Sequence, residues 1–372
     1  MSWLSSGRWH ERRRPAAEGR AFSLTENFTQ RQEGSAVSAA DKIISAGHGG
    51  CLLTVAEAAD RIGSGALLSI AGDEACLRAL PRGNWIGGTI PYFMDEAGGQ
   101  VSRDRVFVTE LPGIAADIRL YDTVGIAGLC MDAPANGYTL LIIPAFSAVH
   151  SLYARRAPDF EDMFVKPVAG WVAGVHLDDL GRVEPLVVDG RSGRFSPEHA
   201  VAIHVTLADE DYATVEIVNV MQPAAGAELR FPETGFSASR CRVDGVEQDF
   251  AEWLQRSGAD LRLPLVADYC GARVNVSFKG INAAEGRVEF YAPVFDDVAY
   301  RLAAPVADYP AALQVALPAG ERADFACNCI LNYLHGGLEG RRAGNFFGPI
   351  TFGEVAYQLL NQTLVYLKVA RA

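Results

Sequence analysis

The middle third of this 372-residue sequence consists of short apolar runs separated by turn-forming residues. Residues 200–205, 213–220 and 274–278 are three such runs, and Asp244-Gly245 is one of the turn signals. Runs this short are typical of strands, and turns at this spacing join antiparallel neighbours. The middle of the chain is therefore predicted to contain an antiparallel sheet.

The segments on either side of that third mix strand and helix patterns. Residues 54–62 place apolar side chains at helical spacing, behind a Thr54/Glu57 pair that matches a capping box. Residues 66–70 and 140–143 read as buried strands. We therefore predict a mixed α/β (α+β) fold of two lobes, in which mixed and antiparallel sheets are flanked by helices.

Composition and pattern divide the chain into three parts. Residues 1–36 combine an Arg-rich start with a polar run, so they are predicted to form a flexible N-terminal arm. Residues 37–220 and 221–372 are predicted to form the two α/β lobes.

A short pattern recurs in the two predicted lobes. Residues 84–90 read NWIGGTI and residues 345–351 read NFFGPIT. Both segments have Asn, an aromatic residue, an apolar residue and Gly in that order, at an offset of 261 residues. A match this short also arises by chance, so it indicates a pseudo-repeat only if both segments form the same structure.

Charge and cysteine usage limit the partners and the compartment. Lys and Arg total 33 against 45 Asp and Glu, which gives a formal net charge of −12. Nucleic-acid binding needs clustered basic residues, so no nucleic-acid partner is expected. The most apolar stretch, residues 138–149, is shorter than the roughly 20 residues of a spanning helix, so no membrane association is expected. Seven scattered Cys form no disulfide framework, which favours a cytoplasmic location.

Familiar catalytic and cofactor-binding motifs are missing from the sequence. Gly83 and Gly88 have the spacing of a phosphate-binding loop, but Thr89 stands where that loop needs Lys. No G-x-G-x-x-G follows a strand, and neither a G-x-S-x-G turn nor His-Glu-x-x-His is present. We therefore predict no cofactor, no metal site and no catalytic residue, and we favour a protein that is not an enzyme.

Cys327 and Cys329 form the most conspicuous candidate pair. Residues i and i+2 of a strand lie on one face, so both thiols would point to the same surface. Two small buried hydrophobic side chains are one interpretation. A ligand-contacting thiol, or a nucleophile with Glu354 or His335 as its base, is the second. Metal ligation is the third, although two Cys have too few partners nearby.

Glu354 and Asn361 are candidate polar residues near the C-terminus. Glu354 follows Gly353 between apolar segments, where a carboxylate can accept from a ligand amine or hydroxyl group. A solvated loop acid or a first-turn helix residue explains it as well. The polar side chains of residues 361–363 either tie down the neighbouring Gly-rich loop, which we favour, or contact a ligand.

Several of these segments resemble FIST-domain proteins. The C-terminal ones are Phe325-Ala-Cys-Asn328, Gly348-Pro-Ile-Thr-Phe-Gly-Glu354 and Leu360-Asn-Gln-Thr-Leu364, and Trp85-Ile-Gly-Gly-Thr89 resembles the N-terminal glycine turn of that family. FIST domains are regarded as intracellular signal-input modules that bind small molecules such as amino acids. The resemblance implies two FIST-like lobes and a sensor that acts through a signalling partner.

The resemblance also implies where a ligand would bind. The expected ligand-binding residues are Gly87, Gly88, Thr89, Cys327, Asn328, Gly353, Glu354 and Asn361. The expected ligand is a small molecule, for instance an amino acid. An enzyme with a Cys nucleophile and a protein-interaction module remain the alternative functions.

Overall fold

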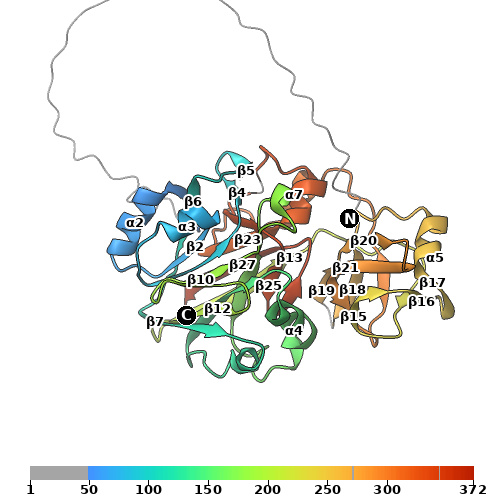
Figure 1. Cartoon of the computed structure of the whole chain (residues 1–372), viewed down its shortest axis with the longest axis horizontal. Coiled ribbons are helices and arrows are strands. Elements are labelled where there is room, and N and C mark those ends of the chain that lie inside the picture. Colours follow the sequence, from blue (N-terminus) through green and yellow to red (C-terminus); the bar gives the residue numbers. More distant parts are fainter. Residues whose placement is uncertain (1–48, 270–271, 343) are drawn as a thin grey trace, which may run out of the picture.

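Three six-stranded sheets form the main body of the molecule, and a β-rich lobe lies beside them (Figure 1). The computed structural model describes residues 49–269, 272–342 and 344–372. The predicted arm, residues 1–36, lies outside these residues. Mixed α/β architecture with mixed and antiparallel sheets is present, as the sequence predicts.

The first unit of the body contains two helices and six strands. Its first helix is capped by Thr54, whose hydroxyl accepts from the Glu57 N–H while the Glu57 carboxylate accepts from the Thr54 N–H, so the capping box is confirmed. The elements are β1 (Cys51–Thr54), α2 (Val55–Gly63), β2 (Leu68–Gly72), α3 (Glu74–Arg78), β3 (Trp85–Thr89), β4 (Tyr92–Asp95), β5 (Gly98–Val101) and β6 (Arg105–Glu110).

The second unit follows directly and has the same order of strands. Its elements are β7 (Ala115–Tyr121), η1 (Gly125–Gly128), β8 (Gly137–Pro144), α4 (Ala148–Arg156), η2 (Ala157–Asp159), β9 (Val168–Ala173), η3 (Leu177–Asp179), β10 (Val187–Asp189), β11 (Arg194–Ser196) and β12 (Ala200–Thr206). The third unit begins with β13 (Asp211–Val218) and is then interrupted by the lobe. It continues with α6 (Tyr309–Ala316), β23 (Phe325–Cys329), α7 (Ile330–Gly336), β24 (Gly348–Thr351), β25 (Glu354–Ala356), β26 (Gln358–Leu360) and β27 (Leu364–Arg371).

The three units repeat one pairing scheme. In each, the last strand lies between the first and second strands and is antiparallel to both, and the second strand is parallel to the third: β2 with β3, β8 with β9, and β23 with β24. The hairpin of each unit then extends the sheet of another unit. Hairpin β4–β5 joins β24, β10–β11 joins β3, and β25–β26 joins β9. This cyclic exchange locks the three units into one body.

The recurring sequence pattern marks the same strand in two of these units. The strand registers agree with the offset of 261 residues. Thr89 pairs with Gly72, and Ile350, 261 residues later, pairs with Asn328. Gly72 and Asn328 are equivalent, because each directly precedes the N-cap residue of a helix. Each unit has a glycine on its third strand at the equivalent place: Gly87, Gly170 and Gly348. A Cβ there would lie 2.7, 1.8 and 1.8 Å, respectively, from a carbonyl oxygen of the second strand. Close approach of the two parallel strands therefore requires glycine.

Residues 219–304 form the inserted lobe, which has its own core. Phe231 packs edge-on against Phe250, Phe290 and Tyr300, with ring centroids 5.2–5.9 Å apart. The elements are β14 (Leu229–Arg230), β15 (Gly235–Ala238), β16 (Arg240–Val243), β17 (Val246–Asp249), α5 (Phe250–Ser257), β18 (Leu265–Tyr269), β19 (Ala272–Val276), β20 (Phe278–Asn282), β21 (Arg287–Val294) and β22 (Tyr300–Leu302). Their pairings are antiparallel, as predicted for this part of the chain.

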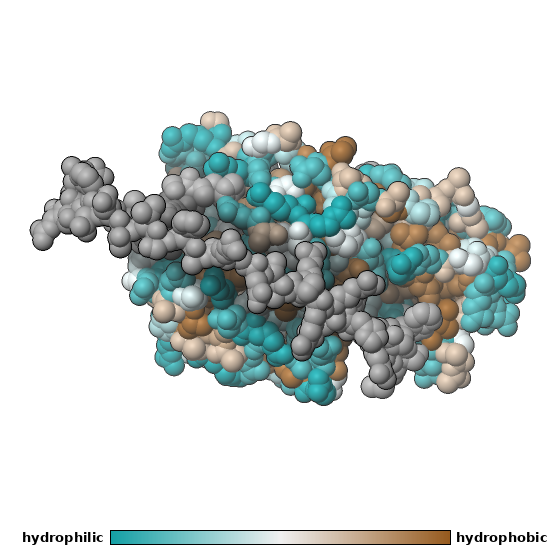
Figure 2. All heavy atoms as spheres, turned by 90° about the horizontal axis from the view of Figure 1, so that it is seen from above, coloured by the Kyte–Doolittle hydropathy of each residue, from teal (hydrophilic) through white to brown (hydrophobic). Residues whose placement is uncertain are grey.

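The sheets divide the chain differently from the predicted lobes 37–220 and 221–372. Strands β23–β27 share sheets with β4, β5, β9 and β13, so residues on both sides of position 220 belong to the same body. The separate part is instead the inserted lobe. Of the described residues, none belongs to a helix with the length and apolar character that crossing a membrane demands. Figure 2 shows mostly hydrophilic residues on one face of the molecule, with small hydrophobic areas between them.

Candidate functional site

A carboxylic acid lies where the repeated fold uses apolar residues. Glu354 begins hairpin β25–β26, is 0% exposed and pairs with Trp171, the residue after Gly170. At the equivalent places of the other two hairpins lie Val187 and Phe93, which are also 0% exposed. Packing of the body therefore does not require an acid at this position, and Glu354 is the centre of the candidate site.

The carboxyl group of Glu354 is only partly satisfied by hydrogen bonds. Its Oε2 accepts from the Thr363 hydroxyl at 2.7 Å and from the Thr363 N–H at 3.2 Å. Its Oε1 has no partner that meets hydrogen-bond geometry, although the Cys329 thiol and the Thr351 hydroxyl lie close enough to favour the ionised form. Burial outweighs these groups and raises the pKa of Glu354 to about 8. The acid is therefore mostly protonated at neutral pH.

Several buried side chains near Glu354 in the fold carry unpartnered polar atoms. Among the described residues, buried side-chain atoms without a hydrogen-bond partner include the acceptors Glu354 Oε1 and Asn361 Oδ1 and the donor Trp171 Nε1, and also Asn328 Nδ2 and Asn332 Oδ1. Asn328 alternates with Cys327 and Cys329 along β23, so its side chain lies on the face opposite the thiols that neighbour Glu354. Each unsatisfied group costs about 1–3 kcal/mol, and a polar molecule that pairs with it would remove that cost.

Contacts connect these atoms into one site at the carboxyl end of β23. Asn332 Nδ2 donates to Asn328 Oδ1 at 2.9 Å and to the Thr363 carbonyl at 3.1 Å. Thr363 also holds Glu354, and a Cβ on Gly353 would lie 3.6 Å from Asn361 Nδ2. The site therefore extends from helix α7 across β23 to the segment 361–363, which we call the 361–363 loop.

The 361–363 loop is also the place where the inserted lobe is attached. Asn275 of the lobe donates from Nδ2 to the carbonyl groups of Asn361 and Gln362, at 3.1 and 3.2 Å. The Ser277 hydroxyl donates to Gln362 Oε1 at 2.7 Å. The loop therefore bonds to Glu354 on one side and to the lobe on the other.

The structure brings together five of the eight residues expected to bind a ligand. Glu354, Asn328 and Asn361 carry unpartnered atoms, Gly353 accepts from the Thr351 hydroxyl at 2.9 Å, and the Cys327 thiol donates to the Gly170 carbonyl at 3.2 Å. All five are buried.

Gly87, Gly88 and Thr89 take part in packing instead. Gly87 permits the close approach of β2, and a Cβ on Gly88 would lie 2.8 Å from the ring of Trp171. The Thr89 hydroxyl accepts from the Leu186 N–H at 2.9 Å. Of the three, Gly88 is the one that lies against Trp171 of the candidate site.

The two thiols lie on strand β23 and are enclosed. Cys327 and Cys329 are 2% and 0% exposed. Burial, and then the nearby Glu354, raise the pKa of both thiols well above the ordinary value. Burial, and then the nearby Arg262 of the inserted lobe, lower the pKa of His335, the other candidate base. A nucleophilic Cys has the opposite character, with a lowered pKa and partial exposure.

Sequence reasoning missed Trp171, Thr351 and Asn332 and gave Thr363 no specific role. Trp171 comes from another strand, and only the pairing of β25 with β9 brings it to Glu354, whereas Thr351 is three residues before Glu354 in the sequence. A Thr before a final strand and an Asn in a helix are too common to be a signal. Among the described residues, His, Cys, Asp and Glu form no group of three or more that could hold a metal ion.

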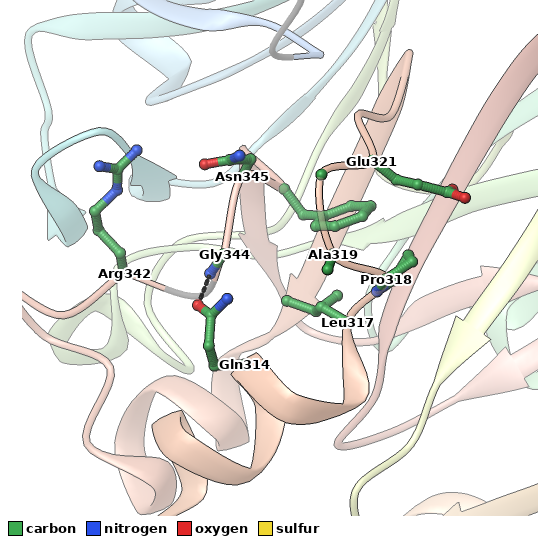
Figure 3. A pocket seen from close by; sticks show the side chains of 10 residues that line it. Gln314, Leu317, Pro318, Ala319, Glu321, Arg342, Gly344 and Asn345 are labelled. Carbon is green, nitrogen blue, oxygen red and sulfur yellow. Dashed lines mark hydrogen bonds between the residues drawn. The ribbon is translucent and has the colours of Figure 1, made fainter.

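A separate hollow of about 210 Å³ lies beside helix α6 (Figure 3). Gln314 accepts from the Gly344 N–H at 3.0 Å, and in Figure 3 Arg342 and Asn345 lie on the side opposite Glu321. The lining residues are Gln314, Leu317, Pro318, Ala319, Gly320, Glu321, Arg342, Gly344, Asn345 and Phe346. None of the expected ligand-binding residues lines it.

Fold and site together define a three-unit α/β protein with an inserted β-lobe and an enclosed polar site. The chain belongs to a family of unknown function, DUF6976, whose model matches residues 53–370. The match spans all three units and the inserted lobe. No curated protein and no solved structure matches the chain.

Proposed function

We propose that this protein binds a small polar molecule at the Glu354 site. The observation that carries the proposal is a fully buried acid with an unpartnered oxygen, next to two further residues, Asn361 and Trp171, that also carry unpartnered polar atoms. Such groups are normally paired in native proteins, so a ligand that pairs with them gains hydrogen bonds at no further desolvation cost to the protein.

The donor and acceptor pattern favours a ligand with an amine group and a second polar group. Glu354 Oε1 and Asn361 Oδ1 are free to accept from an amine, and Trp171 Nε1, on the strand paired with Glu354, is free to donate to a carboxylate or carbonyl. An amino acid has both groups. An ammonium group would also lower the pKa of Glu354, because the opposite charge favours its ionised form.

Thermal unfolding against a panel of amino acids, amines and nucleotides tests the proposal. A ligand at 100 times its dissociation constant adds about 2.7 kcal/mol, so we expect a dose-dependent rise of a few degrees in Tm. Glu354→Gln should abolish that rise, whereas Glu184→Gln, at an exposed position, should keep it. A ligand that stabilises both variants as it does the original protein would refute the Glu354 site.

The proposed role in the cell is that of a cytoplasmic sensor that passes ligand binding to a signalling partner. The scattered Cys support the compartment, and the FIST-like segments support the sensor role. Pull-down with and without the identified ligand tests it, with a ligand-dependent partner as the expected result.

An enzyme that uses Cys327 or Cys329 as its nucleophile is less well supported. Both thiols are enclosed and have a raised pKa, which opposes thiolate formation. Cys329 beside Glu354 is the one feature in its favour. Rapid alkylation of either thiol by iodoacetamide at pH 7 would revive this alternative.

A further inference from the structure

The inserted lobe is joined to the body by a narrow connection. Pro223 and Ala303 form an antiparallel bridge where the chain enters and leaves the lobe. Beside it, the Ala224 N–H donates to the Leu302 carbonyl at 2.8 Å, and the Ala304 N–H donates to the Gln222 carbonyl at 2.7 Å. The lobe has its own aromatic core, but Val266 and Val274 also pack into the central core of the body, so a movement on this connection must separate those contacts.

A polar network fixes the lobe to the 361–363 loop. Asn275 is 0% exposed, and its side chain contacts two loop carbonyls as well as Asn219 Oδ1 at 3.1 Å. Gln362 accepts from Ser277 and donates from Nε2 to the Arg262 carbonyl at 3.1 Å. We call this set of hydrogen bonds, centred on Asn275, Ser277 and Gln362, the latch.

Gln362 has a backbone conformation that other contacts must maintain. Its φ is +49°, in the left-handed region that residues other than glycine rarely adopt. Such a conformation persists where the surroundings hold it. Here the latch holds Gln362 from the lobe, and the next residue, Thr363, bonds to Glu354.

The Glu354 site is closed to solvent. Glu354 and Cys329 are 0% exposed and Asn361 is 1% exposed. A ligand can reach these side chains only when a covering element moves. The 361–363 loop contacts Glu354 through Thr363 and is bonded to the lobe, which lies beside the body in Figure 1 and has a narrow chain connection, so we take the lobe as the element that moves.

Apolar contacts beside the latch define the closed position. Phe236 and Ala292 of the lobe pack with Phe352 and Leu359 of the body. Arg155 of helix α4 lies over the Phe236 ring, 5.3 Å from its centroid. Opening must separate these groups, so the closed form is the stable one without ligand.

We propose that the inserted lobe is a lid over the Glu354 site and that the latch couples its position to the state of that site. The inference rests on the proposed function, because a lid matters only if the site receives a ligand. A ligand that displaces Thr363 from Glu354 shifts the 361–363 loop and weakens the latch. The lobe then carries the signal of ligand binding.

Thiol labelling of the whole protein without ligand tests the lid. Cys329 lies at the enclosed site, while Cys130 is buried in the second unit and serves as the internal reference. With N-ethylmaleimide under native conditions and peptide mass spectrometry, Ser277→Ala should raise the labelling rate of Cys329 at least tenfold and leave Cys130 unchanged. Asn275→Ala, which removes more of the latch, should act in the same direction.

The matched control is Ser257→Ala, which removes a hydroxyl that donates to the Leu254 carbonyl within the lobe, away from the latch. Ser257→Ala should change the labelling rate of neither Cys329 nor Cys130. The lid is refuted if Cys329 labels no faster in Ser277→Ala, or if Cys329 and Cys130 accelerate together, as in global unfolding. If Asn275→Ala does not fold, Ser277→Ala decides alone. Because the test needs no ligand, a negative ligand panel and a failed lid remain separate results.

Discussion

Glu354 is a buried carboxylic acid at a position where the other two units of the fold carry apolar side chains. The equivalent positions carry Val187 and Phe93, and both are buried like Glu354. The raised pKa of Glu354 follows from that burial, because the charged form loses its hydration. A ligand that supplies a positive charge would compensate for this loss.

Glu354→Gln should change how stability depends on pH. The Glu354 carboxyl group has a pKa of about 8 in the folded protein, against an ordinary value of 4.5, so it binds its proton more tightly in the folded protein than in the unfolded chain. The contribution of this tighter proton binding to the free energy of unfolding is therefore fully present below pH 4.5 and is lost as the pH rises to 8. Relative to the Glu354→Gln variant, the free energy of unfolding of the original protein should fall by on the order of 3 kcal/mol between pH 5 and pH 8.

Urea unfolding of both proteins at pH 5, 6.5 and 8 measures this difference. Glu184→Gln, whose side chain is exposed, is the control and should follow the original protein at every pH. A constant difference between Glu354→Gln and the original protein would show that Glu354 titrates normally.

At the scale of elements, sequence patterns predict helix starts correctly where the capping residues lie within a few positions of one another. The Thr54/Glu57 capping box is confirmed, and helix α3 is likewise capped by Asp73, whose carboxylate accepts from the Ala75 N–H. Helix α4 ends at Arg156, and Pro158 follows within a 3-10 turn. Proline has no N–H to donate, so an α-helix continuing through this position would lose a backbone hydrogen bond.

Gly348→Ala should be strongly destabilising. A Cβ at Gly348 would lie 1.8 Å from the Ala326 carbonyl oxygen, so β23 and β24 would have to separate. We expect the free energy of unfolding to fall by more than about 2 kcal/mol, because the paired backbone of two strands cannot shift to relieve the clash without breaking their pairing. Chemical denaturation measures the loss.

Gly63→Ala is the matched control for this substitution. Gly63 ends helix α2, and a Cβ there would meet nothing within 4 Å. Alanine favours helix by up to about 1 kcal/mol over glycine, so this variant should be as stable as the original protein or more stable. Equal losses in both variants would contradict the role of Gly348.

At the scale of the whole molecule, exchange of hairpins joins three units, and the lobe is an insertion into the third. Residues 224–302 leave the body at the Pro223–Ala303 bridge, where paired Cα atoms lie about 4.5–5.5 Å apart. A linker of a few residues can span that gap. Replacing 224–302 with a short Gly/Ser linker should leave a body that unfolds cooperatively.

Thermal unfolding and near-ultraviolet circular dichroism test that expectation. The shortened protein should be less stable than the full chain, because Val266 and Val274 of the lobe pack into the central core and Asn275 holds the 361–363 loop. A linker of the same length inserted after Gly245, in the turn between β16 and β17, is the control. Loss of any cooperative transition would mean that the body depends on the lobe to fold.

The sequence by itself determined the local elements, the mixed α/β class and the placement of Cys327 and Cys329 on one strand, because caps and alternation act over a few residues. It also contained the recurring glycine pattern, although not the third copy around Gly170. The tertiary structure decided the rest. Glu354 meets Trp171 only through the pairing of β25 with β9, and the 361–363 loop meets Asn275 only because the lobe packs there. Such contacts depend on strand pairing between distant parts of the chain, and no short-range pattern encodes them.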